Sequence, residues 1–129
     1  MSQILLIESD RLLASNITEV VQGSGHRVKW QVDLQSAIES VDAQHPDLII
    51  LDLMLAGRSG AEFLYELRSY PEWQSLPVII FSDVARADLA DSSISLEDLA
   101  ISQFLYKPTS SLNDLLQAVN QALSVVTKN

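Results

Sequence analysis

Four short apolar runs constrain the fold of this chain more than any other feature, because each one ends at a polar residue. They are residues 4–7 (ILLI), 48–51 (LIIL), 78–81 (VIIF) and 104–106 (FLY). Uninterrupted runs of this length, rich in Ile, Leu and Val, are typical of strands buried on both faces of a parallel sheet. A fifth segment, residues 26–30 (HRVKW), fits a strand nearer the edge of that sheet.

Segments with helical spacing of apolar residues separate these runs. They cover residues 13–21, 34–41, 63–67 and 112–126. Asp10 and Asp33 are placed to cap the first two helices, and Ser111 with Asp114 has the spacing of a capping box before the last. Residues 84–102 are less regular, and we expect a helix broken near Ser92 with its main turn at residues 96–101. The alternation predicts an α/β fold, a doubly wound five-stranded parallel sheet with helices on both faces.

Length and composition fit one domain spanning residues 1–129. The chain carries 17 acidic and 8 basic residues, a formal charge of −9, which argues against binding to nucleic acid or to an anionic membrane surface. It contains no cysteine, so disulfides and thiolate chemistry are excluded. A secretory leader and a membrane-spanning run are both missing from the sequence, and we expect a cytoplasmic protein.

The residues that follow the apolar runs predict a phosphate and metal site. In a parallel sheet, ligands bind outside the carboxyl ends of the strands, so Glu8, Asp52, Ser82 and Lys107 should converge. Asp52 could act as a nucleophile toward a phosphoryl donor if a cation screens the two negative charges. Mg²⁺ is suited to this role, held by Glu8, Asp52 and the backbone carbonyl of Met54. Lys107 would add a positive charge and Ser82 a hydroxyl donor.

Three segments resemble the receiver domain of bacterial two-component response regulators, in particular the single-domain regulators of chemotaxis. They are PDLIILDLMLAGRSG (46–60), PVIIFSD (77–83) and FLYKP (104–108). The resemblance implies a flavodoxin-like (βα)5 fold, Asp52 as phosphoacceptor, Ser82 as the partner hydroxyl and Lys107 before a cis peptide bond to Pro108. It also implies Phe104 as an aromatic switch, Mg²⁺ as cofactor, a histidine kinase or phosphotransfer protein as donor, and a downstream protein partner.

Two of the departures from the family's pattern lie at the predicted site. The family carries an acidic pair after the first strand, whose second member binds magnesium directly, and here the pair reads Glu8-Ser9. Because a hydroxyl binds a hard cation less well than a carboxylate, we expect weak Mg²⁺ binding; Asp10 could substitute, but a helix-capping role is favoured for it. Asp83 follows Ser82 where the family has a small residue, and its charge should repel a dianionic phosphate.

Two functions compete. The first is a switch that accepts a phosphoryl group on Asp52 and signals through protein binding; the second is a degenerate receiver that docks to proteins without phosphorylation. Enzymatic activity is not expected beyond slow autophosphorylation and autodephosphorylation. An aspartate-based phosphatase needs a second aspartate where Met54 stands, and a flavin carrier needs a phosphate-binding loop that is missing after Ile7.

Overall fold

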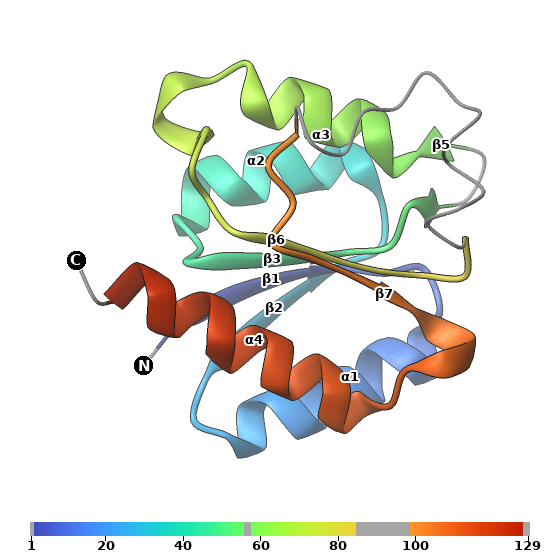
Figure 1. The fold of residues 1–129 in the computed structure, drawn as a ribbon. Helices are drawn as coiled ribbons and strands as arrows, with labels where there is room; N and C mark the ends of the chain where they lie inside the picture. Colours follow the sequence, from blue (N-terminus) through green and yellow to red (C-terminus); the bar gives the residue numbers. More distant parts are fainter. Residues whose placement is uncertain (1, 56–57, 85–98, 128–129) are drawn as a thin grey trace.

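Five parallel strands form a single central sheet (Figure 1). The computed structural model describes residues 2–55, 58–84 and 99–127, and the statements below concern these residues. The strand order is β2-β1-β3-β6-β7, which confirms the predicted doubly wound sheet with its second strand at an edge. The strands are β1 (Gln3–Ile7), β2 (Arg27–Gln31), β3 (Leu48–Leu51), β6 (Val78–Ser82) and β7 (Gln103–Tyr106).

Helices cover both faces of this sheet. In Figure 1, α2 and α3 lie on one side and α1 and α4 on the other. The break near Ser92 and residues 96–98 of the helix predicted at 96–101 lie outside the described residues, whereas residues 99 and 100 form a turn and residue 101 is not helical. A short antiparallel hairpin, β4 (Met54–Leu55) with β5 (Arg58–Ser59), was not predicted. The helical segments are α1 (Arg11–Gly23), α2 (Leu34–Gln44), α3 (Gly60–Arg68), η1 (Pro71–Trp73), η3 (Lys107–Thr109) and α4 (Leu112–Thr127).

Alternation along the buried strands builds two separate cores. In β1, Leu5 and Ile7 face α2 and α3, whereas Ile4 and Leu6 face α1 and α4. Successive side chains of a strand point to opposite faces, so a run that is apolar at every position serves both cores. This explains why the central strands lack the polar–apolar alternation of a one-sided sheet. No helix in the described part of the chain is both long and apolar enough to cross a bilayer.

The predicted helix caps are present. Asp10 Oδ1 accepts a hydrogen bond from the Leu13 amide at 3.1 Å, and Asp33 caps α2 in the same way. At α4 the capping box is reciprocal, since Asp114 Oδ2 accepts from the Ser111 amide and Ser111 Oγ accepts from the Asp114 amide. Each cap satisfies amides that a helix N-terminus leaves without partners.

A half-buried arginine joins α3 to the turn that leads into β7. Arg68 donates to the carbonyl oxygens of Leu99, Ala100 and Trp73 at 2.8, 3.1 and 2.6 Å. Burial lowers the pKa of Arg68. Ala100 has a left-handed backbone, φ 53°, which costs a residue with a side chain about 1–2 kcal/mol. The two charge-assisted hydrogen bonds to Leu99 and Ala100 hold this strained turn in place.

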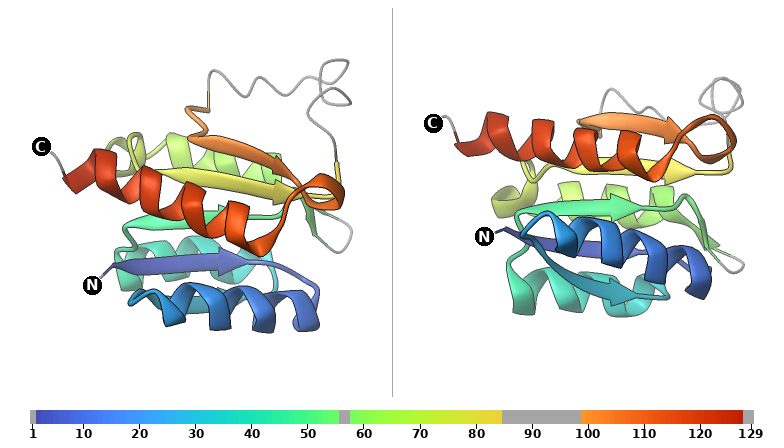
Figure 2. Two further views of the ribbon diagram at one scale, coloured as in Figure 1. Left: turned by 60° about the horizontal axis from the view of Figure 1, so that its bottom comes forward. Right: turned by 90° about the horizontal axis from the view of Figure 1, so that it is seen from below.

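The register of the sheet brings the carboxyl ends of its strands to one edge. Ile7 pairs with Leu51, and Ser82 pairs with Tyr106. The residues that follow β1, β3 and β7, namely Glu8, Asp52 and Lys107, are therefore neighbours in space. Figure 2 shows the strands pointing toward the same side, where η3 and the first turn of α1 also lie.

Candidate functional site

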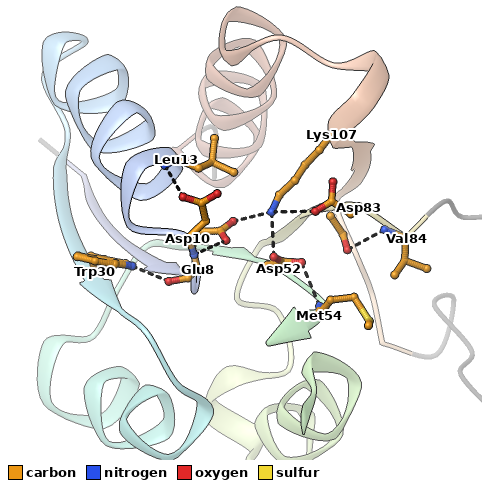
Figure 3. Close-up of polar contacts among 10 residues, drawn as sticks. Glu8, Asp10, Leu13, Trp30, Asp52, Met54, Asp83, Val84 and Lys107 are labelled. Carbon is orange, nitrogen blue, oxygen red and sulfur yellow. Dashed lines mark hydrogen bonds and ion pairs between the residues drawn. The ribbon is translucent and has the colours of Figure 1, made fainter. Parts of the chain in front are cut away.

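The ammonium group of Lys107 lies between two buried carboxylates. Its Nζ is 2.9 Å from Glu8 Oε1 and 2.9 Å from Asp52 Oδ2 (Figure 3). The side chains of Glu8 and Asp52 are 2% and 4% exposed, and that of Lys107 is 12% exposed. The three residues come from the ends of three different strands, so the predicted convergence of Glu8, Asp52 and Lys107 is present in the structure.

Backbone amides hold the second oxygen of each carboxylate. Glu8 Oε2 accepts from the Asp10 amide at 3.0 Å, and Asp52 Oδ1 accepts from the Met54 amide at 3.0 Å. The loop after Asp52 is held close by Gly60, where a Cβ atom would come within 2.9 Å of the Asp52 carbonyl oxygen. Both carboxylates are thus fixed at both oxygens, and their geometry does not depend on solvent.

An indole group also fixes the position of Glu8, a role that sequence reasoning missed. Trp30 Nε1 donates to the Glu8 backbone carbonyl oxygen at 2.7 Å. The signal that could have found it is the parallel pairing of β1 with β2, which places Trp30 beside Leu6, two residues before Glu8.

Ser82 and Phe104 lie on the same face of the sheet. Ser82 is fully buried at the end of β6, and its Oγ accepts a hydrogen bond from the Val84 amide at 3.2 Å. Phe104 pairs with Ile80, two residues before Ser82, and packs half-buried against the core beneath α2 and α3. Because residues two apart in a strand share a face, a shift of Ser82 can reach Phe104 through contacts on that face.

The two residues considered as further metal ligands lie at the surface. Ser9 and Asp10 are exposed, and the Asp10 carboxylate is engaged as the cap of α1. The donor set therefore consists of two carboxylates, Glu8 and Asp52, which suits Mg²⁺ in ligand type but supplies few charges. Within the described ranges, no group of three or more His, Cys, Asp or Glu side chains is arranged to hold a metal ion.

Burial and mutual contact shift the pKa values of Glu8 and Lys107. Burial raises the pKa of Glu8, and the nearby charge of Asp52 adds to this effect, while the hydrogen bonds from Lys107 and from the Asp10 amide oppose it. Burial alone would lower the pKa of Lys107, but the hydrogen bonds and charges of Glu8 and Asp52 outweigh it, and the pKa is raised. One positive charge serves two negative ones, so the ionised site is strained electrostatically.

Neutralising Glu8 is expected to stabilise the fold near neutral pH. A raised folded-state pKa means that the native protein holds the Glu8 proton more tightly, so the stabilisation is complete below the unfolded value of 4.5 and is lost as the pH rises through the folded value. Glu8→Gln should therefore raise the free energy of unfolding at pH 7 by on the order of 1 kcal/mol. Urea denaturation of both proteins at pH 4 and pH 7 tests this, and a destabilised Glu8→Gln at pH 7 would contradict it.

One expectation at this site is wrong. The resemblance implied a cis peptide bond between Lys107 and Pro108, but no described peptide bond is cis. The trans form of an X-Pro bond is favoured by about 0.5–1 kcal/mol. Pro108 here lies in the first turn of η3, where its fixed φ and missing N–H are well tolerated.

Comparison with known proteins identifies the family. Residues 4–120 match the sequence profile of the family described as "Response regulator receiver domain". The chain belongs to this family. It is similar to the KDP operon transcriptional regulatory protein KdpE of Escherichia coli K12, with 33% identity over 108 residues, which are 84% of this chain and 45% of that protein. It therefore spans about half the length of that relative.

Solved receiver domains share the fold. The signal receiver domain of a histidine kinase from Syntrophus aciditrophicus is 22% identical, with a TM-score of 0.86 over 100% of this chain and 95% of that one. The Mn²⁺-bound form of response regulator Rcp1 is 25% identical, with a TM-score of 0.73 over 96% and 93% of the two chains. The predicted family and fold are confirmed. These comparisons do not favour the alternative of a phosphorylation-independent docking module.

Proposed function

We propose that Asp52 of this receiver accepts a phosphoryl group and that the product controls binding to another protein. The observation that carries the proposal is the buried contact of Asp52 with Lys107, at 2.9 Å, at the shared edge of the strands. A carboxylate held in this way is oriented for attack, and the adjacent ammonium can bind the oxygens of an incoming phosphoryl group. A lysine in a water-exposed position would contribute much less.

The same contacts suggest how the signal leaves the site. A new phosphoryl group competes with Glu8 and Asp52 for Lys107, and it offers acceptor oxygens to the buried Ser82 hydroxyl. Ser82 would then turn from the Val84 amide toward the phosphoryl group and draw its loop inward. Phe104, on the same face of the sheet, would follow and change the surface presented to a partner.

Magnesium would be held by the Glu8 and Asp52 carboxylates and the Met54 carbonyl, with weak affinity because Ser9 contributes no charge. Bound there, the cation neutralises the charge between Asp52 and the donor. The proposed donor is a histidine kinase or phosphotransfer protein, and the proposed output is binding to a downstream protein in the cytoplasm. The only reactions proposed for the chain itself are slow self-phosphorylation and slow hydrolysis of its own phosphoryl group.

The experiment is to incubate the protein with acetyl phosphate and Mg²⁺ and to measure its intact mass. We expect a shift of one phosphoryl group that is abolished by Asp52→Asn and reduced strongly by removing the metal. Asn keeps the size of the side chain and its acceptor toward the Met54 amide, so the loss would report on the nucleophile itself.

The matched control is Asp47→Asn, which removes a carboxylate from the opposite edge of the sheet, where Asp47 accepts from the Gln3 amide. It should label as the unmodified protein does. Labelling that persists in Asp52→Asn would show that another residue is the acceptor, and no labelling of any variant at high donor concentration would contradict the proposal.

A further inference from the structure

A third carboxylate lies beside the site lysine, on its solvent side. Asp83 Oδ2 is 3.9 Å from Lys107 Nζ, and the Asp83 side chain is 71% exposed, against 4% for Asp52 (Figure 3). Asp52 and Asp83 both lie within 4 Å of the same ammonium, so their oxygens are about 7 Å apart at most. A phosphoryl donor that reaches Asp52 therefore comes close to the Asp83 charge.

The backbone keeps Asp83 at this position. Ser82 is the last residue of β6 and is held in the sheet by its pairing with Tyr106. Its Oγ accepts from the Val84 amide at 3.2 Å, which closes a turn around Asp83. Ser82 and Val84 thus place Asp83 at the outer edge of the site, with its carboxylate within 4 Å of the Lys107 ammonium.

The charges of the site do not balance. Glu8, Asp52 and Asp83 are three carboxylates around the one ammonium of Lys107. Asp83 is the outermost of them, so its field acts on a donor before the donor engages Lys107. Coulomb repulsion scales with the donor's charge, which means that Asp83 opposes a dianion about twice as strongly as a monoanion.

We propose that Asp83 selects phosphodonors by charge, disfavouring dianionic acyl phosphates relative to phosphoramidates. This inference rests on the proposed function, because it concerns the reaction of Asp52. Phosphoramidates carry less net negative charge at neutral pH than acyl phosphates do, since their nitrogen can carry a proton.

The chemical step is the same for both donor classes. A carboxylate oxygen of Asp52 forms a bond to phosphorus, and the phosphorus–nitrogen or phosphorus–oxygen bond of the donor breaks. The leaving nitrogen or oxygen keeps the electron pair of that bond, and the protonated nitrogen departs as a neutral amine. Asp83 takes no part in these bond changes and acts only through its charge.

The test compares labelling rates of Asp83→Asn and the unmodified protein with acetyl phosphate and with phosphoramidate, followed by intact mass. We expect the ratio of the acetyl phosphate rate to the phosphoramidate rate to rise about three- to tenfold in Asp83→Asn at low ionic strength. In 0.5 M salt, where the Debye length is only about 4 Å, the rise should shrink to less than about twofold. Asp83→Lys should raise the ratio further.

Taking both rates in one protein at one Mg²⁺ concentration cancels any change in metal binding. The control is Asp42→Asn, which removes an exposed charge from the other end of the molecule, near the end of α2, and should leave the ratio unchanged. An equal change for both donors, or none, would overturn the role of Asp83 while leaving Asp52 as acceptor. Failure of every variant to label with either donor would overturn the proposed function as well.

Discussion

Lys107→Met is expected to lower the free energy of unfolding by about 3 kcal/mol at pH 8, because it leaves two buried carboxylates without their shared counterion. Glu8 and Asp52 are 2% and 4% exposed, so solvent can replace little of the lost interaction. Met fills most of the space of the lysine side chain and can keep its contact with the Phe81 ring, over which Lys107 lies. The loss should therefore report on charge rather than on packing.

The pH dependence separates this electrostatic cause from a simple packing defect. Glu8 already has a raised pKa, and without Lys107 its proton should be held still more tightly in the folded protein. The destabilisation by Lys107→Met should shrink as the pH falls from 8 to 5, because protonation removes one of the two charges. In the unmodified protein the contribution of Lys107 is complete below pH 10.5 and is lost only as the pH rises through its raised folded-state pKa.

A double-mutant cycle tests whether Lys107 is the shared counterion of Glu8 and Asp52. Urea denaturation of Glu8→Gln, Lys107→Met and the double variant at pH 8 should show that Lys107→Met costs at least about 1 kcal/mol less in the Glu8→Gln background. Lys29→Met, an exposed lysine on the edge strand β2, is the matched control and should cost little. Equal losses in both backgrounds, independent of pH, would mean that Lys107 does not act as the shared counterion.

The sequence predicted the parts of this site that follow from strand order. Runs that are apolar at every position indicated strands buried on both faces, and parallel pairing then placed Glu8, Asp52, Ser82 and Lys107 at one edge. The caps at Asp10 and Ser111 were also readable, because a short polar side chain three residues before a helical amide has few other roles.

Contacts that depend on strand register or on side-chain direction could not be predicted from the sequence. The hydrogen bond from Trp30 to the Glu8 carbonyl requires the exact alignment of β1 and β2, which the composition of an edge strand does not specify. The contacts of Arg68 with Leu99 and Ala100 join residues 31 and 32 positions apart, across a segment of irregular pattern. The trans bond before Pro108 was missed because the family pattern was carried over to a turn whose isomer no local residue determines.

Ser9→Asp is expected to strengthen the binding of magnesium to this receiver. Ser9 follows Glu8 directly and is exposed at the edge of the site, so a carboxylate there can reach a cation held by Glu8 and Asp52. Replacing a hydroxyl by a charged oxygen ligand should lower the Kd for Mg²⁺ about tenfold or more. Calorimetry measures the Kd directly. Tryptophan fluorescence offers a second readout, because the Trp30 indole donates a hydrogen bond to the Glu8 backbone carbonyl.

The stability of Ser9→Asp without metal provides a second test. A further carboxylate would share the one ammonium of Lys107, so without metal the variant should be less stable than the unmodified protein. Saturating Mg²⁺ should reverse this, since a ligand that binds only the folded state stabilises it by about 2.7 kcal/mol at 100 times its Kd. Ser15→Asp, the same change on the exposed face of α1, controls for the added charge. Equal Mg²⁺ affinities of Ser9→Asp and Ser15→Asp would mean that the residue after Glu8 does not limit metal binding.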